Sequence, residues 1–256
     1  MDTAPLGNFV WLDLLSPDPS ASIAFYTDVL GWTTKPFADN YVMFASAQGP
    51  LGGVTTITDP LREQGVPPHW AGFVQVSDAR RVALEAQRLG GRIWREPTEY
   101  PEIGYLGVIA DPQGAVINLV QPPQPMRLHD PAGPGELNWS ELMTSDHQAA
   151  FAFYSQLFGW KQARSFDMGP GGEYLIFGNG GRDLGGMFTK GVDRPGPAGW
   201  LYYLETANLD AALARVSRRG GRVLNGPMRV PGGARVAQLA DPHGVMFALH
   251  ENARGV

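Results

Sequence analysis

Short stretches in which hydrophobic and polar residues alternate make up most of this chain, and they are separated by turns rich in glycine and proline. Alternation with period two predicts strands, and an apolar repeat near 3.6 predicts helices. The segment 78–89 shows the helical repeat and ends at Gly90 and Gly91, where a left-handed cap is expected. In the first half the pattern predicts strands at 9–15, 33–36, 41–45, 53–57, 69–76, 92–94, 105–110 and 115–120, and helices at 20–29 and 78–89.

The same pattern occurs twice along the chain. The octapeptide from Phe25 to Trp32 recurs from Phe153 to Trp160 with matching aromatic and glycine positions. Self-similarity over such a length indicates a duplication. Further matches, in the same order, join 11–14 with 139–142, 51–53 with 184–186, 90–92 with 220–222, and 110–114 with 240–244.

Each half divides again into two β-α-β-β-β modules. We therefore predict an α+β protein of four βαβββ modules that form two tandem domains with cup-shaped mixed sheets. The first domain is expected at residues 1–122 and the second at 135–256. Between them, residues 123–134 contain several prolines, which favour an extended connector.

Composition narrows the classes of partner. A net charge of −5 and an isoelectric point near 5.5 argue against nucleic acid and acidic membranes as partners. Cysteine is absent, which excludes disulfides and thiolate chemistry. The first eight residues lack the pattern of a signal peptide, and no apolar run has the length of a membrane span. We expect a cytoplasmic protein, either a monomer or a homodimer.

Three short motifs occur in the same order in both halves: Phe-Tyr-x-x-x-Leu/Phe-Gly-Trp, Gly-Gly and Asp-Pro-x-Gly. In this order they resemble the vicinal oxygen chelate superfamily of glyoxalases, bleomycin-resistance proteins and extradiol dioxygenases. The repeated Trp-x-Asp/Glu-Leu opening is similar to a two-domain, glyoxalase-like or hydroxylase-like group of actinobacteria. The resemblance implies that paired modules curl into a cup whose concave face, in the enzymes of the superfamily, holds a divalent metal.

The positions at which the resemblance places metal ligands carry poor ligands here. Indole has no lone pair to offer a metal, and alkyl side chains have none. We therefore expect no cofactor in the usual place, although a divalent metal held by another set of residues stays open. The positions concerned are Trp11, Ala71 and Asn118 in the first half and Trp139, Leu201 and Ala248 in the second.

The five histidines are scattered along the sequence. His69 and His250 lie on predicted strands and are candidates to touch a ligand, with a surface role as the alternative. His129, His147 and His243 are expected in a linker, at the head of a helix and in a turn, and we expect all three to be solvated.

Strand alternation assigns a set of large apolar and isolated polar residues to the cups. Such a lining suits a hydrophobic or aromatic small molecule, because rings stack while amides and carboxylates fix its orientation. The alternative is that the tryptophans fill the cups as core. The expected ligand-facing residues are Trp11, Asp13, Phe73, Gln75 and Asn118 in the first cup and Trp139, Glu141, Met143, Tyr203 and Glu205 in the second.

Asp13 and Glu141 are the candidate catalytic residues. A carboxylate beside an indole and away from bulk water has its pKa raised, which suits general acid or base catalysis. The alternative is that each accepts hydrogen bonds from backbone or a tyrosine and only stabilises its strand. Tyr41 and Tyr174 lie on corresponding predicted strands, and two placements are open for them. Their hydroxyls point into the cups, or their rings pack against neighbouring side chains of the sheet.

Two functions from different classes follow. In the first, the protein is a metal-independent lyase, isomerase or hydroxylase-like enzyme of small-molecule or secondary metabolism. In the second, it sequesters a hydrophobic or aromatic antibiotic without chemistry, as bleomycin-resistance proteins do. A protein-interaction module with filled cups is a third class.

Overall fold

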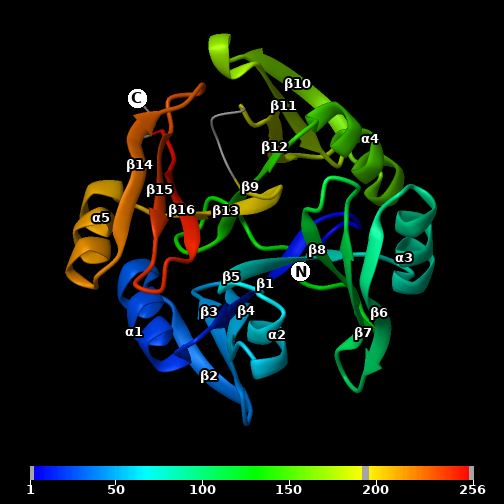
Figure 1. The fold of residues 1–256 in the computed structure, drawn as a ribbon. Coiled ribbons are helices and arrows are strands. Elements are labelled where there is room, and N and C mark those ends of the chain that lie inside the picture. The colour runs from blue at the N-terminus through cyan, green and yellow to red at the C-terminus, as the bar shows by residue number, and fades with distance from the viewer. Residues whose placement is uncertain (1–2, 192–195, 254–256) are drawn as a thin grey trace. The chain divides into compact units, whose positions relative to one another are not determined.

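The computed structural model describes residues 3–191 and 196–253. Its elements follow the order β-α-β-β-β four times, as predicted (Figure 1). The first half contains β1 (Phe9–Ser16), α1 (Pro19–Leu30), β2 (Thr33–Ala38), β3 (Tyr41–Ser46), β4 (Gly49–Thr56), α2 (Asp59–Glu63), β5 (His69–Gln75), α3 (Ala79–Arg88), β6 (Arg92–Tyr100), β7 (Gly104–Ala110) and β8 (Val116–Gln121). The second half contains β9 (Leu137–Thr144), α4 (His147–Phe158), β10 (Lys161–Asp167), the 3-10 turn η1 (Gly169–Gly171), β11 (Glu173–Gly178), β12 (Asp183–Thr189), β13 (Gly199–Glu205), α5 (Leu209–Arg218), β14 (Arg222–Arg229), β15 (Arg235–Ala240) and β16 (Met246–Glu251).

Each half forms one eight-stranded sheet. The hydrogen-bonded order is β2-β3-β4-β1-β5-β8-β7-β6 in the first and β10-β11-β12-β9-β13-β16-β15-β14 in the second. The sheets are mixed, because β1 and β4 are parallel, as are β5 and β8, while the remaining neighbours within each module are antiparallel. The predicted α+β class with two tandem domains is therefore confirmed.

The helices begin and end where local chemistry requires it. At the start of each of the four long helices in the described chain, an Asp or Asn side chain accepts a hydrogen bond from the backbone N–H three residues later. Helix α1 ends at Gly31, whose φ of 72° is left-handed, and α4 ends in the same way at Gly159. The short α2 was not predicted, because five residues are too few for an apolar repeat.

The described modules pack into two compact units, and each unit contains one module from each half. Unit 1 consists of Met1–Val10, Gly72–Leu128 and Trp139–Leu201, and unit 2 of Trp11–Ala71, His129–Asn138 and Tyr202–Val256. The second module is thus grouped with the third, and the first module with the fourth. The sequence left this pairing open. The predicted boundary between the domains at residues 123–134 remains a prediction.

In unit 2, hydrogen bonds between motifs from the two halves of the chain join the modules. The hydroxyl of Tyr26, from the Phe-Tyr motif on α1, donates to Asp241 of the second-half Asp-Pro-x-Gly turn at 3.2 Å. The indole of Trp32 donates to the carbonyl of Gly135 at 2.9 Å. Helix α1 also packs against α5 (Figure 1).

Unit 1 repeats this arrangement with the roles of the halves exchanged. The hydroxyl of Tyr154 donates to Asp111 at 3.1 Å, and the indole of Trp160 donates to the carbonyl of Gly7 at 2.7 Å. The aromatic motif of one module therefore binds the turn or leading segment of a module from the other half. Three of the motifs' residue types, Tyr, Trp and Asp, are explained by this packing.

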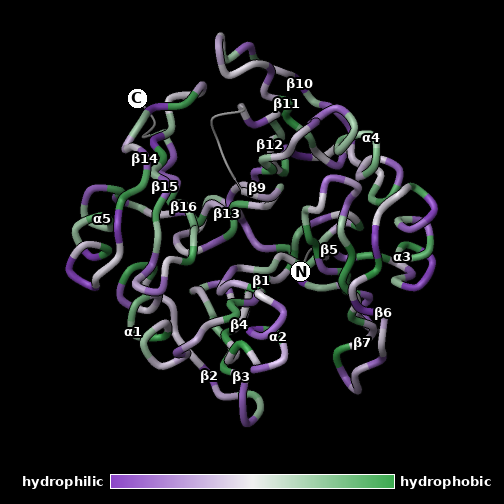
Figure 2. The backbone as a smooth tube through the Cα atoms, in the orientation of Figure 1, coloured by the Kyte–Doolittle hydropathy of each residue, from purple (hydrophilic) through white to green (hydrophobic). Residues whose placement is uncertain are grey.

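The hydropathy of the helices can be compared with their burial. Figure 2 shows both hydrophilic and hydrophobic residues along α3 and α5. Each helix buries an apolar set at helical spacing, but Leu84 of α3 is 62% exposed. None of the helices in the described ranges is long and apolar enough to cross a membrane.

Candidate active site

A triangle of hydrogen bonds joins three predicted site residues in unit 2. The Trp11 indole donates to Asp13 Oδ1 at 2.8 Å and to the Tyr41 hydroxyl at 2.9 Å. The Tyr41 hydroxyl in turn donates to the same Oδ1 atom at 2.5 Å. All three side chains are half-buried. Trp11 and Asp13 lie on the same face of β1, opposite Leu12 and Leu14, which are buried as strand alternation predicts.

The Gly-Gly motif creates the space for this triangle. Gly53 lies beside Asp13 in the parallel pairing of β1 with β4, and a Cβ on Gly53 would overlap the ring and hydroxyl of Tyr41. A Cβ on Gly52 would overlap the carbonyl oxygen of Leu12. Gly53 thus lets the tyrosine ring lie across β4 to reach the carboxylate, and Gly52 lets the two strands approach.

Burial shapes the electrostatics of the triangle. It raises the pKa of Asp13 from 3.8 to about 6, against the opposing effect of the hydrogen bonds from Tyr41 and Trp11. Burial also raises the pKa of Tyr41, and the neighbouring charge and hydrogen bond of Asp13 raise it further. The phenol therefore stays protonated at physiological pH, while the carboxyl titrates near neutrality. Such a pair can both accept and donate a proton.

A matching cluster lies in unit 1. The Trp139 indole donates to the Tyr174 hydroxyl at 2.9 Å, and that hydroxyl donates to Glu141 Oε2 at 2.9 Å. Gly186 lies beside Glu141, and a Cβ there would overlap the Tyr174 ring. The ring of Tyr174 also stacks on Phe188, with centroids 6.0 Å apart. The hydroxyls of Tyr41 and Tyr174 thus bind the two candidate carboxylates, an arrangement the sequence left as one of two alternatives.

The metal that the superfamily implies does not fit the residues at its expected positions. Both indole N–H groups at the first-strand positions point at tyrosine hydroxyls, so each indole serves as a hydrogen-bond donor. Throughout residues 3–191 and 196–253, no group of three or more His, Asp or Glu side chains is arranged to hold a metal ion. We derive no chemical step through a metal.

Two of the predicted ligand-facing residues are occupied with the protein's own backbone or side chains. Gln75 is only 1% exposed; its amide donates to the carbonyl of Ala4 and accepts from the N–H of Met126. Glu205 is buried and accepts from His250 at 2.6 Å and from the N–H of Asn252 at 3.1 Å. Both side chains hold chain segments in place, and we leave them out of the proposals below.

The other predicted residues are divided between the two units. Phe73, Asn118 and Met143 belong to unit 1, where Phe73 and Met143 are half-buried and Asn118 is buried. Tyr203 belongs to unit 2, where its hydroxyl accepts a hydrogen bond from Gln238 at 3.0 Å. Each of these residues remains a predicted ligand contact.

The expectation that three histidines are solvated was wrong for His147. This residue is 8% exposed, and its ring bonds to Thr189 at 2.8 Å and to Glu173 at 3.3 Å. His129 is also largely covered and bonds to Glu136 at 2.9 Å. The partners come from distant strands or from the linker, which a residue-by-residue interpretation of the sequence does not bring together.

The bond between His250 and Glu205 was also missed, although the sequence held a signal for it. The sequence analysis named both residues as candidates to contact a ligand, and in the structure they are register partners in the parallel pair of β13 and β16. Pairing these two strands in the sequence would have placed the imidazole beside the carboxylate.

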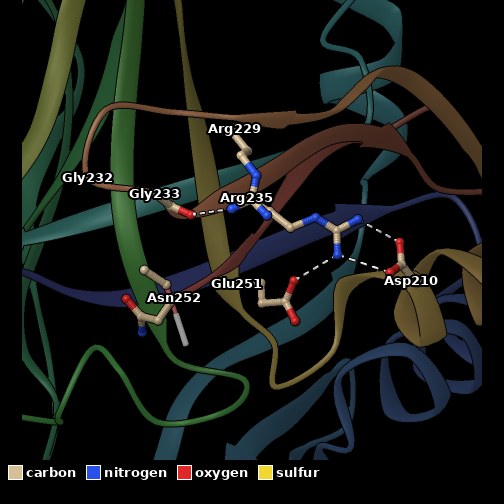
Figure 3. Close-up of a pocket in the computed structure, with 8 residues that line it drawn as sticks. Asp210, Arg229, Gly232, Gly233, Arg235, Glu251 and Asn252 are labelled. Atoms are coloured by element: carbon tan, nitrogen blue, oxygen red, sulfur yellow. Dashed lines mark hydrogen bonds and ion pairs between the residues drawn. The ribbon is translucent and has the colours of Figure 1, made fainter. Parts of the chain in front are cut away.

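A pocket of different character lies in unit 2 between the β14–β15 loop and the start of α5. Figure 3 shows Arg235 reaching Asp210 on one side and Glu251 on the other, at 2.7 and 3.1 Å. Arg229 donates to the carbonyl of Gly233. Because two carboxylates surround Arg235, the pocket carries no excess of positive charge, and its polar groups bond to one another.

The fold and the repeated cluster define a two-domain member of one superfamily. A profile of the Glyoxalase/Bleomycin resistance protein/Dioxygenase superfamily matches residues 8–119 and 136–249, so the chain belongs to this superfamily. It is 30% identical to the anthracycline biosynthesis protein DauV of Streptomyces sp. (strain C5), over 94% of this chain and 92% of that protein.

Solved structures show the same fold. A variant of homoprotocatechuate 2,3-dioxygenase from B. fuscum superposes with a TM-score of 0.69 over 98% of this chain and 74% of that chain, at 16% identity. A mutant of 4-hydroxymandelate synthase from Streptomyces coelicolor superposes with a TM-score of 0.67 over 99% and 95%, at 14% identity. At these identities the likeness concerns the fold alone.

Proposed function

We propose that the protein is an enzyme of secondary metabolism that transfers a proton on a flat aromatic molecule bearing a carbonyl group, and that Asp13 and Tyr41 handle the proton. The observation that carries the proposal is the convergence of two donors on one oxygen. Tyr41 and Trp11 both donate to Asp13 Oδ1. In the described chain Oδ2 accepts no hydrogen bond, and it is the oxygen left to meet a ligand.

The chemistry is general acid and base catalysis. With a pKa of about 6, Asp13 is mostly ionised at neutral pH yet takes up a proton at small cost. Asp13 Oδ2 accepts the proton from the carbon next to the ligand's carbonyl, and the Tyr41 hydroxyl donates its proton to the carbonyl oxygen, which gives the enol. Return of a proton to carbon restores the carbonyl, at the same or another position, and returns both residues to their starting state.

The aromatic class of the ligand rests on the indole and on the relatives. Trp11 is half-buried on the face of β1 opposite the buried Leu12 and Leu14, and an indole face stacks well on a flat ring. DauV, which aligns with nearly the whole chain, is named for anthracycline biosynthesis. Both support an aromatic, carbonyl-bearing ligand of secondary metabolism.

Solvent deuterium exchange tests the proposal directly. The probe is α-tetralone, a small aromatic ketone, incubated with the protein in D2O and followed by mass spectrometry. We expect exchange at the carbon beside the carbonyl well above the buffer rate. In a Glu141→Gln background, which removes the carboxylate of the cluster in unit 1, Asp13→Asn should lower this rate by about 100-fold or more, and Tyr41→Phe by about 10-fold or more, since a positioned acid or base contributes on that scale.

Tyr105→Phe is the matched control, because Tyr105 is a strand tyrosine that bonds to the exposed Glu99 in unit 1. It should exchange α-tetralone at the wild-type rate. Glu141→Gln tests the second cluster, which we propose as a further proton-handling pair with Tyr174; its loss should remove only the share of exchange that the second cluster provides.

Sequestration without chemistry is the alternative that the same experiment decides. If wild-type protein binds α-tetralone, exchange equals the buffer rate, and Trp11→Ala weakens binding while Asp13→Asn does not, the enzyme proposal is wrong. The cluster then serves only to shape a binding surface.

A further inference from the structure

Asn118, on β8 in unit 1, is a buried amide whose side chain makes no hydrogen bond to any described residue. It is 6% exposed. Neither amide atom of Asn118 is among the fully buried polar atoms that lack a partner in the described chain, so the amide keeps contact with solvent and is free to bind a group from outside. Its neighbours Ile117 and Leu119 are fully buried on the face of β8 toward α3, so Asn118 lies on the opposite face.

The strand register places Asn118 within a row of side chains that crosses the sheet. Phe73 on β5 is its partner on one side, and Val108 on β7 is its partner on the other. Arg95 on β6 continues the row beyond Val108 and is exposed at the sheet edge. One buried amide therefore lies between two apolar side chains, with a cation at the rim.

The corresponding row of the second half, in unit 2, has its polar groups in other places. It runs through Tyr203, Ala248, Gln238 and Asn225. The Gln238 amide reaches past the small Ala248 to donate to the Tyr203 hydroxyl at 3.0 Å, and it accepts from Asn225 at 3.4 Å. This row satisfies its polar groups internally, whereas the first-half row does not.

We propose that Asn118 is a specificity-determining residue whose amide binds a hydroxyl or carbonyl group on the ring of the ligand, while Phe73 and Val108 contact the ring itself. The second-half row, closed by its own hydrogen bonds, does not take this group, so the recognition of the substituent belongs to unit 1, separately from what binds at Asp13 in unit 2. The inference rests on the aromatic ligand class of the proposed function and adds which polar substituent is recognised and by which half.

Calorimetric titration with 2-naphthol and naphthalene, which differ by one hydroxyl, tests this. Wild-type protein should have one site per chain that binds 2-naphthol about 10-fold more tightly than naphthalene, as expected for one added hydrogen bond. Asn118→Leu, similar in size, should remove this preference and leave naphthalene binding unchanged. Gln238→Leu, the matched change in the second-half row, should keep the preference.

Thermal unfolding of the variants is the control for misfolding. Without ligand, Asn118→Leu should melt close to wild type, since the substitution removes no hydrogen bond within the described protein and keeps the size of the side chain. A retained preference for 2-naphthol in Asn118→Leu would overturn the inference, and so would its loss in Gln238→Leu. If neither compound binds wild-type protein, the ligand class of the proposed function fails as well, so the two failures are distinguishable.

Discussion

The hydroxyl of Tyr26 lies 3.2 Å from Asp241 Oδ2, and this contact joins two recurring motifs that come from opposite halves of the chain. The Trp70 indole donates to the same hydroxyl at 3.0 Å. Tyr26 is fully buried, and its pKa is raised chiefly by burial and next by the charge of Asp241, so it remains a neutral donor. The tyrosine of the Phe-Tyr motif is therefore a structural centre of unit 2.

Removing this hydroxyl should destabilise the protein. Tyr26→Phe leaves a buried indole N–H and a carboxylate oxygen without their partner, so we expect a loss of about 1 to 3 kcal/mol in the free energy of unfolding. Urea denaturation measures it. Tyr105→Phe, at a half-buried position where the hydroxyl bonds only to the exposed Glu99, should change the free energy of unfolding by no more than about 0.5 kcal/mol; equal losses in both variants would contradict the structural role of Tyr26.

The composition of the units predicts how separated halves behave. Because each unit combines modules from both halves, residues 1–128 expressed alone lack the modules they pack against. We expect this fragment to self-associate through the faces so exposed, and to form a 1:1 complex when coexpressed with residues 129–256. Size-exclusion chromatography with light scattering measures the molar masses of the fragments and of their complex. A stable monomer of either fragment would show that modules can pair within a half.

Asp13 should make stability depend on pH in a defined direction. Its pKa is raised from 3.8 to about 6 on folding, so the folded state binds the proton more tightly. The associated stabilisation is fully present below about pH 4 and is lost as pH rises through about 6. Burial also raises the pKa values of Asp111 and Asp241, which adds a trend of the same sign.

The contribution of Asp13 to the pH dependence of stability is obtained by comparing Asp13→Asn with wild type. Asp13→Asn should lose less stability than wild type between pH 4 and pH 7, by about 1 to 3 kcal/mol for a shift of this size in a half-buried group. Urea midpoints at the two pH values give the number. Parallel pH profiles for the two proteins would mean that Asp13 does not titrate in this window.

Substitution of Gly53 should impair the protein as much as substitution of Asp13 or Tyr41, the two residues whose contact Gly53 makes possible. In Gly53→Ala the new Cβ overlaps the Tyr41 ring, which must move away from Asp13. We expect a loss of about 1 to 3 kcal/mol in stability, as for other overpacked sites, together with slower exchange of α-tetralone. Gly199→Ala is the control, because a Cβ there meets no atom and the backbone is not left-handed. Wild-type exchange by Gly53→Ala would show that the position of Tyr41 is unimportant.

The sequence by itself determined the duplication, the four modules and the shared face of Trp11 and Asp13 on β1. Alternation along β1 put Trp11 and Asp13 on one side, and an apolar repeat located α3, because both patterns are local consequences of backbone geometry. Locally encoded features of this kind do not require knowledge of which strands meet.

Only the tertiary structure decided which residues share a bond. Tyr41 reaches Asp13 across β4, His250 meets Glu205 through strand pairing, and Gln75 binds the leading segment at Ala4. The grouping of modules across halves was open for the same reason. Hydrogen bonds between residues distant in sequence depend on register and packing, which the pattern of one strand cannot supply.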